Sequence, residues 1–145
     1  MTTASAPPVF RRPAAERDVA AIRDLLAGVE AGVNARDPER CVARFAADAR
    51  SVTADGRRAV GRDAVRAAHA AAFAGPLATV TARFALIDVC FPRDDVAVAT
   101  TGAWAVGDGA EVDRDRPPTV VVYVLVRDRD GWWVASRQFT RVAAP

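Results

Sequence analysis

The only histidine of the chain is its most suggestive residue for chemistry. His69 lies in the stretch GRDAVRAAHAAAFAG, residues 61–75, and is the single imidazole among the 145 residues. An imidazole titrates near neutral pH, so a histidine on the wall of a pocket can transfer protons. The alternative is a histidine that packs in the core and makes one hydrogen bond. The sequence leaves both interpretations open.

Helical spacing in this stretch indicates which way His69 points. Val65, His69 and Phe73 follow one another at intervals of four, so they share one face of a helix. Arg62 and Arg66 occupy the solvent face. We therefore expect His69 to face the core or the mouth of a pocket. The sequence identifies no particular carboxylate as its partner.

Polar residues of the last predicted strand, WWVASRQFTRV, are further candidates. Strict alternation puts Ser136 and Gln138 on the same face as Trp132 and Val134, which we expect to be the concave face. Polar side chains on a pocket wall orient a ligand by hydrogen bonds. The alternative is a partly exposed strand end.

The other strands contribute further candidates. Thr100 and Trp104 share a face, where Trp104 is either a flat wall for an aromatic ligand or a core residue. Tyr123 lies between valines, and its hydroxyl needs a partner if it is buried, whichever face it occupies. Asp88 either faces solvent or is a buried carboxylate with a raised pKa. Asp48 is expected to follow a short helix and to bind the backbone.

Composition excludes several classes of function. Hydrophobic residues make up 51% and charged residues 26% of the chain, as in a globular domain. Arginines are interspersed with acids at a net charge of +2, which argues against nucleic-acid binding. We find no signal peptide or membrane span and expect a cytoplasmic protein. Cys41 and Cys90 have no metal-ligand spacing, so we expect two buried free thiols and no metal.

Small, polar and proline residues predict a flexible segment over residues 1–13. Hydrophobic periodicity predicts one α+β domain over residues 14–145. A long helix is expected from about Ala14, and a short helix after Asp37 that carries Phe45 inward. A hairpin at Asp55-Gly56 and the helix containing His69 follow. Four antiparallel strands complete the domain, with a polar loop, VGDGAEVDRDRPP, between two of them.

An ordered set of motifs resembles the SgcJ/EcaC family of the SnoaL-like, or nuclear transport factor 2-like, superfamily. The motifs are NARD, FAADA, GRDAV, HAAAFAGP and WWVASRQ, and the resemblance runs over residues 16–142. It implies a cone in which a curved antiparallel sheet wraps the long helix and encloses a pocket. It also implies a homodimer formed through the sheet. The family pattern often has tryptophan before Asn34, whereas this chain has Val33, so we expect a larger space there.

The resemblance also implies a function, because similar proteins are encoded beside enediyne polyketide genes in actinomycetes. The expected function is that of a cofactor-free enzyme or accessory factor that binds a hydrophobic polyketide intermediate. Alternatives are a protein that sequesters a reactive natural product, and a dimeric interaction module. No GxGxxG motif follows a strand, so we expect no cofactor. His69 is the candidate acid–base of a cyclase-, isomerase- or hydrolase-like reaction, and the candidate ligand-binding residues are Asn34, Thr100, Trp104, Tyr123, Ser136 and Gln138.

Overall fold

The computed structural model describes residues 4–106 and 111–143 of the chain. The helices are α1 (Glu16–Asn34), α2 (Pro38–Cys41) and α3 (Arg62–Phe73). The strands are β1 (Phe45–Val52), β2 (Arg58–Val60), β3 (Thr81–Arg93), β4 (Val96–Val106), β5 (Thr119–Asp128) and β6 (Gly131–Arg141). This confirms the α+β class. In the described part of the chain, no helix is long and apolar enough to cross a membrane.

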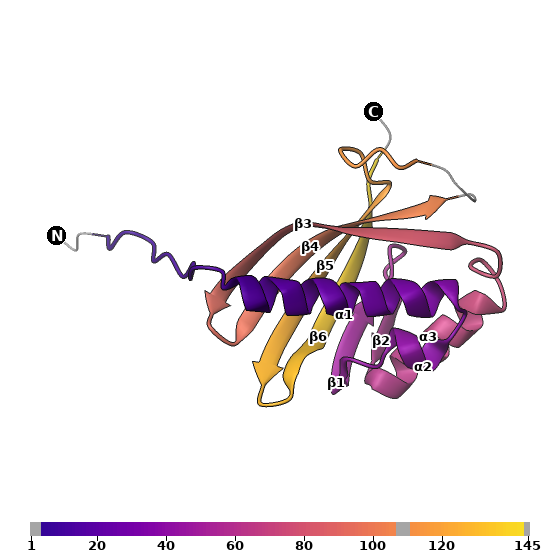
Figure 1. Cartoon of the computed structure of the whole chain (residues 1–145), viewed down its shortest axis with the longest axis horizontal. Coiled ribbons are helices and arrows are strands. Elements are labelled where there is room, and N and C mark those ends of the chain that lie inside the picture. Colours follow the sequence, from indigo (N-terminus) through magenta and orange to yellow (C-terminus); the bar gives the residue numbers. More distant parts are fainter. Residues whose placement is uncertain (1–3, 107–110, 144–145) are drawn as a thin grey trace.

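The strands form one open sheet in the order β2-β1-β6-β5-β4-β3. Neighbouring strands are antiparallel except for β1 and β6, which run parallel. That parallel pair joins the early hairpin to the last strand, so both halves of the chain share one sheet. Figure 1 shows α1 lying along one face of the curved sheet, with α2 and α3 near the C-terminal end of α1.

The apolar stripe of α1 forms the centre of the core, as its spacing predicts. The helix begins at Glu16, slightly later than expected, and buries its apolar residues between sheet and α2: Ile22, Leu25, Leu26, Val29 and Val33. Gly32 allows α2 to approach closely. A Cβ at Gly32 would lie 2.7 Å from the backbone nitrogen of Cys41 and 3.0 Å from its Cα.

The short second helix is shorter than predicted. It is capped by Asp37, whose side chain accepts a hydrogen bond from the Arg40 backbone N–H, and it ends at Cys41. Phe45 is buried as expected, but it starts β1, and Asp48 lies exposed within that strand. The prediction that Asp48 follows a helix is wrong, because pairing with β2 and β6 draws this segment into the sheet.

The structure describes the Asp55-Gly56 loop fully, and the polar loop before β5 and the N-terminal segment in part. The hairpin containing Asp55-Gly56 is confirmed, with Gly56 at a φ of +86°, but residues 53–57 join its strands instead of the predicted two-residue turn. In the polar loop before β5, residues 107–110 lie outside the described part, and residues 111–118 form neither helix nor strand. Residues 4–11 extend away from the domain in Figure 1, and Arg12 donates a backbone hydrogen bond to Phe91. Residues 1–3 lie outside the described part of the chain, and the flexibility of residues 1–13 stays a prediction.

A one-residue bulge in β6 changes which side chains face α1. Leu125 of β5 pairs with Val134, whereas the adjacent Val124 pairs with Ser136, so Ala135 is an extra residue. An extra residue reverses the alternation of every position after it. Before the bulge the even-numbered residues face the core, and after it the odd-numbered ones do.

Ser136 and Gln138 therefore do not share a face with Trp132 and Val134, and that prediction is wrong. Trp132 and Val134 are buried, whereas Gln138 is exposed and Ser136 half-buried on the outer face. Arg137 takes the inward position, where strict alternation assigns a solvent-facing side chain.

The close approach at Gly32 predicts that Gly32→Ala destabilises the protein. The new methyl group meets backbone atoms, which cannot rotate away, so we expect a loss of about 1–3 kcal/mol in the free energy of unfolding. Gly28→Ala in the same helix is the matched control, because a Cβ there meets no atom within 4 Å. It should stabilise the protein by about 0.5–1 kcal/mol through helix propensity. Urea denaturation of both variants measures these changes, and an equal response would contradict the close packing.

Candidate functional site

Arg137 is the centre of a polar cluster inside an otherwise apolar core. Only 4% of its surface is exposed. Its Nε donates a hydrogen bond to Ser51 Oγ at 3.1 Å, and its Nη2 lies 3.1 Å from His69 Nε2. The rings of Phe45 and Phe139 flank the guanidinium, with centroids 4.9 and 4.8 Å from Cζ. The β6 bulge and the parallel β1–β6 pairing, in which Ser51 is opposite Arg137, bring this cluster together.

His69 reaches the cluster from α3, on the apolar face that its spacing predicts. It is 9% exposed, and its ring centroid lies 5.8 Å from that of Phe73. Because an arginine can only donate, His69 Nε2 must accept the hydrogen bond, which makes the imidazole neutral with its proton on Nδ1. Burial, and then the charge of Arg137, lower the pKa of His69 from 6.5 to about 3. His69 is therefore a neutral group at physiological pH and not a proton donor in its charged form.

Tyr123 and Cys41 complete the cluster in their neutral forms. Tyr123 of β5 pairs with Arg137 across the strands and is buried on the inner face, which settles the face it occupies. Burial raises the pKa of its hydroxyl, and the neighbouring Arg137 opposes that rise. Burial likewise raises the pKa of the Cys41 thiol to about 11, so it is not a thiolate nucleophile at neutral pH. Cys41 is a buried free thiol, as predicted, whereas Cys90 is only half-buried.

The cluster carries one positive charge without a carboxylate partner among the described residues. The ion pairs of that part of the chain lie elsewhere and join Asp55 to Arg57, Glu39 and Asp63 to Arg66, and Asp18 to Arg127. Asp88 is exposed, so it does not enter the core. Within residues 4–106 and 111–143, His, Cys, Asp and Glu side chains form no group of three that could hold a metal ion.

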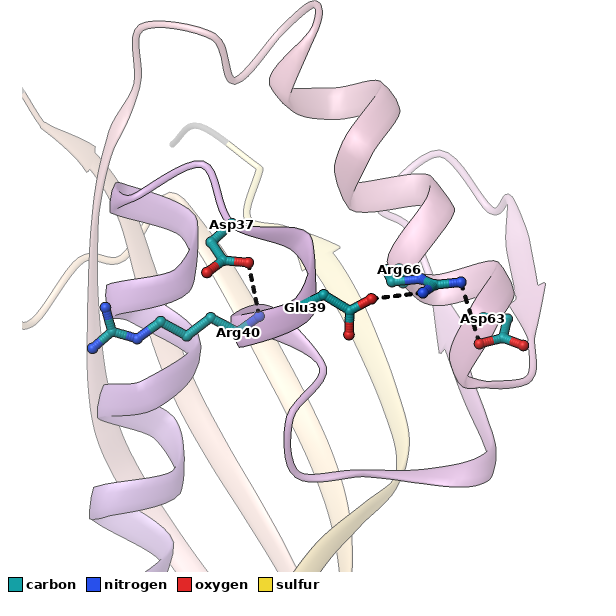
Figure 2. Close-up of polar contacts among 5 residues, drawn as sticks. All are labelled: Asp37, Glu39, Arg40, Asp63 and Arg66. Atoms are coloured by element: carbon teal, nitrogen blue, oxygen red, sulfur yellow. Dashed lines mark hydrogen bonds and ion pairs between the residues drawn. The ribbon is translucent and has the colours of Figure 1, made fainter.

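Exposed ion pairs join α3 to α2 and to its own first turn. Figure 2 shows Arg66 of α3 between Glu39 of α2, at 2.6 Å, and Asp63 of its own helix, at 3.4 Å. Asp37, which caps α2, lies nearby. All of these carboxylates are exposed, and exposed pairs contribute little to stability. Of the side chains of α3, only Val65 and His69 are buried.

The remaining predicted site residues do not join His69. Asn34 is tied to the backbone of Ala82, donating from Nδ2 at 3.1 Å and accepting at Oδ1 at 2.7 Å, which fixes the end of α1 to β3. Thr100 and Trp104 lie on the outer face, opposite the cluster, because their inward neighbours pair with the core positions of β5. Trp104 is covered by the segment before β5 and donates from Nε1 to the Asp113 carbonyl. Thus, of the predicted ligand-binding residues, only Tyr123 lies beside Arg137, the residue that His69 contacts.

Arg137 is the functional candidate that reasoning from the sequence missed. The sequence does not mark the position of the β6 bulge, since its extra residue, Ala135, is neither glycine nor polar.

Two surface clefts, of about 620 and 610 Å³, are not lined by His69, Arg137 or Tyr123. The first lies along Phe45–Asp48, Trp133 and Ala135, where the pairing of β1 with β6 shifts register.

The depressed pKa of His69 predicts a specific loss of stability in acid. The unfolded chain binds a proton below pH 6.5 that the native protein excludes until about pH 3. The stabilisation is therefore complete above pH 6.5 and declines as the pH falls from 6.5 toward 3. Wild type should lose about 2 kcal/mol relative to His69→Gln between about pH 7.5 and pH 5, at about 1.4 kcal/mol per pH unit.

Urea unfolding of both proteins at the two pH values measures this difference, because glutamine does not titrate. The single imidazole also gives one NMR signal to follow. A native-state titration of that signal near pH 6.5 would contradict the buried neutral state.

Several solved protein structures have a fold similar to that of this chain. A structure from Nostoc punctiforme PCC 73102, described as a domain of unknown function with a cystatin-like fold, is 22% identical and superposes with a TM-score of 0.78, covering 90% of this chain and 81% of that one. A ketosteroid isomerase-like protein from Erwinia carotovora atroseptica SCRI1043 is 16% identical, with a TM-score of 0.67 and coverage of 89% and 99%. The protein Aln2 from a Streptomyces species is 19% identical, with a TM-score of 0.70 and coverage of 90% and 94%.

These likenesses show the fold alone, since all three identities are below 25%. No curated protein sequence matches the chain significantly. The sequence model of the SnoaL-like domain, however, matches residues 15–138, which span nearly the whole folded domain. The chain belongs to the SnoaL-like domain family.

Proposed function

We propose that this protein binds a hydrophobic small molecule between α3 and the inner face of the sheet. The polar cluster of His69, Ser51, Tyr123 and Arg137 is the observation that carries the proposal, because it sits among buried apolar side chains. Pockets that bind small molecules are mostly apolar, with a few convergent polar groups that orient the ligand. The cluster has this composition.

A ligand must displace side chains to reach the cluster. Val65 on the His69 face of α3 is buried, as are Phe45 and Tyr123 beside Arg137, so side chains fill the interior around the cluster. The element that can yield is α3, since it buries only Val65 and His69 and is fastened to α2 by an exposed ion pair. Binding would therefore couple to a movement of α3.

The resemblance of the motifs to the SgcJ/EcaC family supports a finer assignment, a polyketide intermediate of the enediyne type. In the catalytic version of this proposal, a cofactor-free cyclase, isomerase or accessory factor acts on that intermediate in the cytoplasm. A pKa of about 3 disfavours His69 as an acid–base before the ligand binds. The Nδ1–H of the neutral His69 ring can still donate a hydrogen bond to the intermediate.

A non-catalytic protein that sequesters a reactive natural product is the second candidate. The same low pKa favours it, together with the lack of a carboxylate beside His69 in the described part of the chain. Deletion of the gene in the source organism separates the two candidates. Accumulation of an unprocessed intermediate supports catalysis, and self-killing during production supports protection.

Homodimerisation through the outer face of the sheet is also proposed. That face carries the half-buried valines Val98, Val122 and Val124, and Val126 is 39% exposed. Burying such side chains against a second copy removes apolar surface from water. Valines on two adjacent strands suit a self-complementary contact.

Binding is tested first with two aromatic probes, anthraquinone and 2-naphthoate, by isothermal titration calorimetry. We expect at least one to bind, and Tyr123→Phe to weaken its affinity by about fivefold, the effect of one hydrogen bond. Gln138→Ala, on the outer face, should leave the affinity unchanged. If neither probe binds the folded protein, the proposed function is wrong.

Dimerisation is tested by light scattering at micromolar concentration. Wild type should show twice the chain mass of 15.4 kDa. Val124→Lys places a charge in the contact and should yield a monomer, whereas Val60→Lys, at an exposed site on the edge strand β2, should remain dimeric. A monomeric wild type would refute the dimer.

A further inference from the structure

We propose that the ligand is an organic anion, a hydrophobic molecule whose carboxylate or enolate oxygen binds the guanidinium of Arg137. This inference rests on the proposed function and specifies the chemistry of the same interior site. It assigns the specificity of binding to Arg137, a residue that lies in the core only because of the β6 bulge.

The charge of Arg137 is the first reason. A buried cation is costly unless it is paired and hydrogen-bonded. Here its hydrogen-bond partners are neutral, namely Ser51 Oγ and His69 Nε2. The faces of Phe45 and Phe139 offset part of the cost by cation–π attraction. In the described part of the chain no carboxylate pairs with this guanidinium, so the site has a charge to be complemented.

The geometry of the guanidinium is the second reason. Its Nε and Nη2 contact Ser51 and His69, and the Tyr123 hydroxyl lies within hydrogen-bonding reach of the same guanidinium. A planar guanidinium between two rings presents its donors along its edges. Carboxylates and enolates bind such an edge in its plane, by charge-assisted hydrogen bonds. An anionic oxygen that replaces the His69 acceptor at Nη2 would leave the bond from Nε to Ser51 Oγ in place.

The surroundings select the rest of the ligand. Phe45, Phe139 and Phe73 are aromatic side chains in or against the core cluster, and they supply apolar contacts for the body of the molecule. The Tyr123 hydroxyl lies beside the guanidinium in its neutral form and can donate to the same anionic oxygen. An inorganic anion would use the charge but none of these rings. A hydrophobic anion uses both.

His69 is the group that the anion displaces. Its hydrogen bond to Nη2 joins α3 to the sheet, and α3 begins after Gly61, which has a φ of +93° that a glycine adopts without strain. An anion at Arg137 offers a stronger acceptor than a neutral imidazole. His69 would then exchange its partner, and its unique imidazole NMR signal would shift.

The experiment compares 2-naphthoate with 2-naphthamide, a neutral analogue of the same shape, by calorimetry at about pH 7, where the carboxylate is charged. Wild type should bind the carboxylate about 10- to 100-fold more tightly, the range for hydrogen bonds to a charged group. Arg137→Gln should reduce the affinity for the carboxylate to that for the amide. Arg137→Met, which matches the arginine stem in length, serves as a second variant if the glutamine protein does not fold.

Arg141→Gln is the matched control, because Arg141 is an exposed arginine on the same strand, and it should retain the preference. The imidazole signal of wild type should shift with 2-naphthoate and stay in place with the amide. Equal binding of both probes overturns the inference and leaves the proposed function standing. Failure of both probes and of anthraquinone refutes the proposed function itself.

Discussion

The hydrogen bond between Arg137 and His69 depends on one extra residue in β6, and the interior site depends on that bond. Without the bulge at Ala135, Arg137 would face solvent and Ser136 would face the core. With it, a guanidinium enters the core and needs acceptors there, which Ser51 of β1 and His69 of α3 supply. A single register change thus joins elements that are far apart in the sequence. It also ties α3 to the sheet, since His69 is one of the two buried residues of that helix.

The same contact determines the chemistry that the site can perform. A buried cation beside an imidazole disfavours a second positive charge, so His69 remains neutral and accepts a hydrogen bond. Tyr123 and Cys41 stay protonated because burial raises the pKa of each. The site therefore presents one fixed positive charge surrounded by neutral donors and acceptors. Such an arrangement suits recognition and orientation of an anionic group better than proton transfer by the protein itself.

Much of the fold follows from local patterns that tertiary contacts do not override. The stripe of α1, the Asp37 cap, the hairpin at Asp55-Gly56 and the β-branched strands all occur as their residues predict. The end of the second helix does not, because a segment that local preference leaves undecided is drawn into β1 by pairing with β6. Asn34 illustrates the same limit at the site. Its polarity suggests a ligand contact, yet its amide is engaged by the Ala82 backbone, 48 residues away.

The sequence by itself determined the α+β class, the SnoaL-like family and the direction of His69 toward the apolar side of its helix. It determined the class and the direction of His69 because helical and strand periodicities are properties of neighbouring residues. The family follows instead from the resemblance of an ordered set of motifs. Only the tertiary structure decided that Arg137, and neither Ser136 nor Gln138, lies beside His69. Strand register is set by the partner strand, and one bulged residue inverts every later side chain. The alternation of residues along β6 does not show at which residue the side chains change faces.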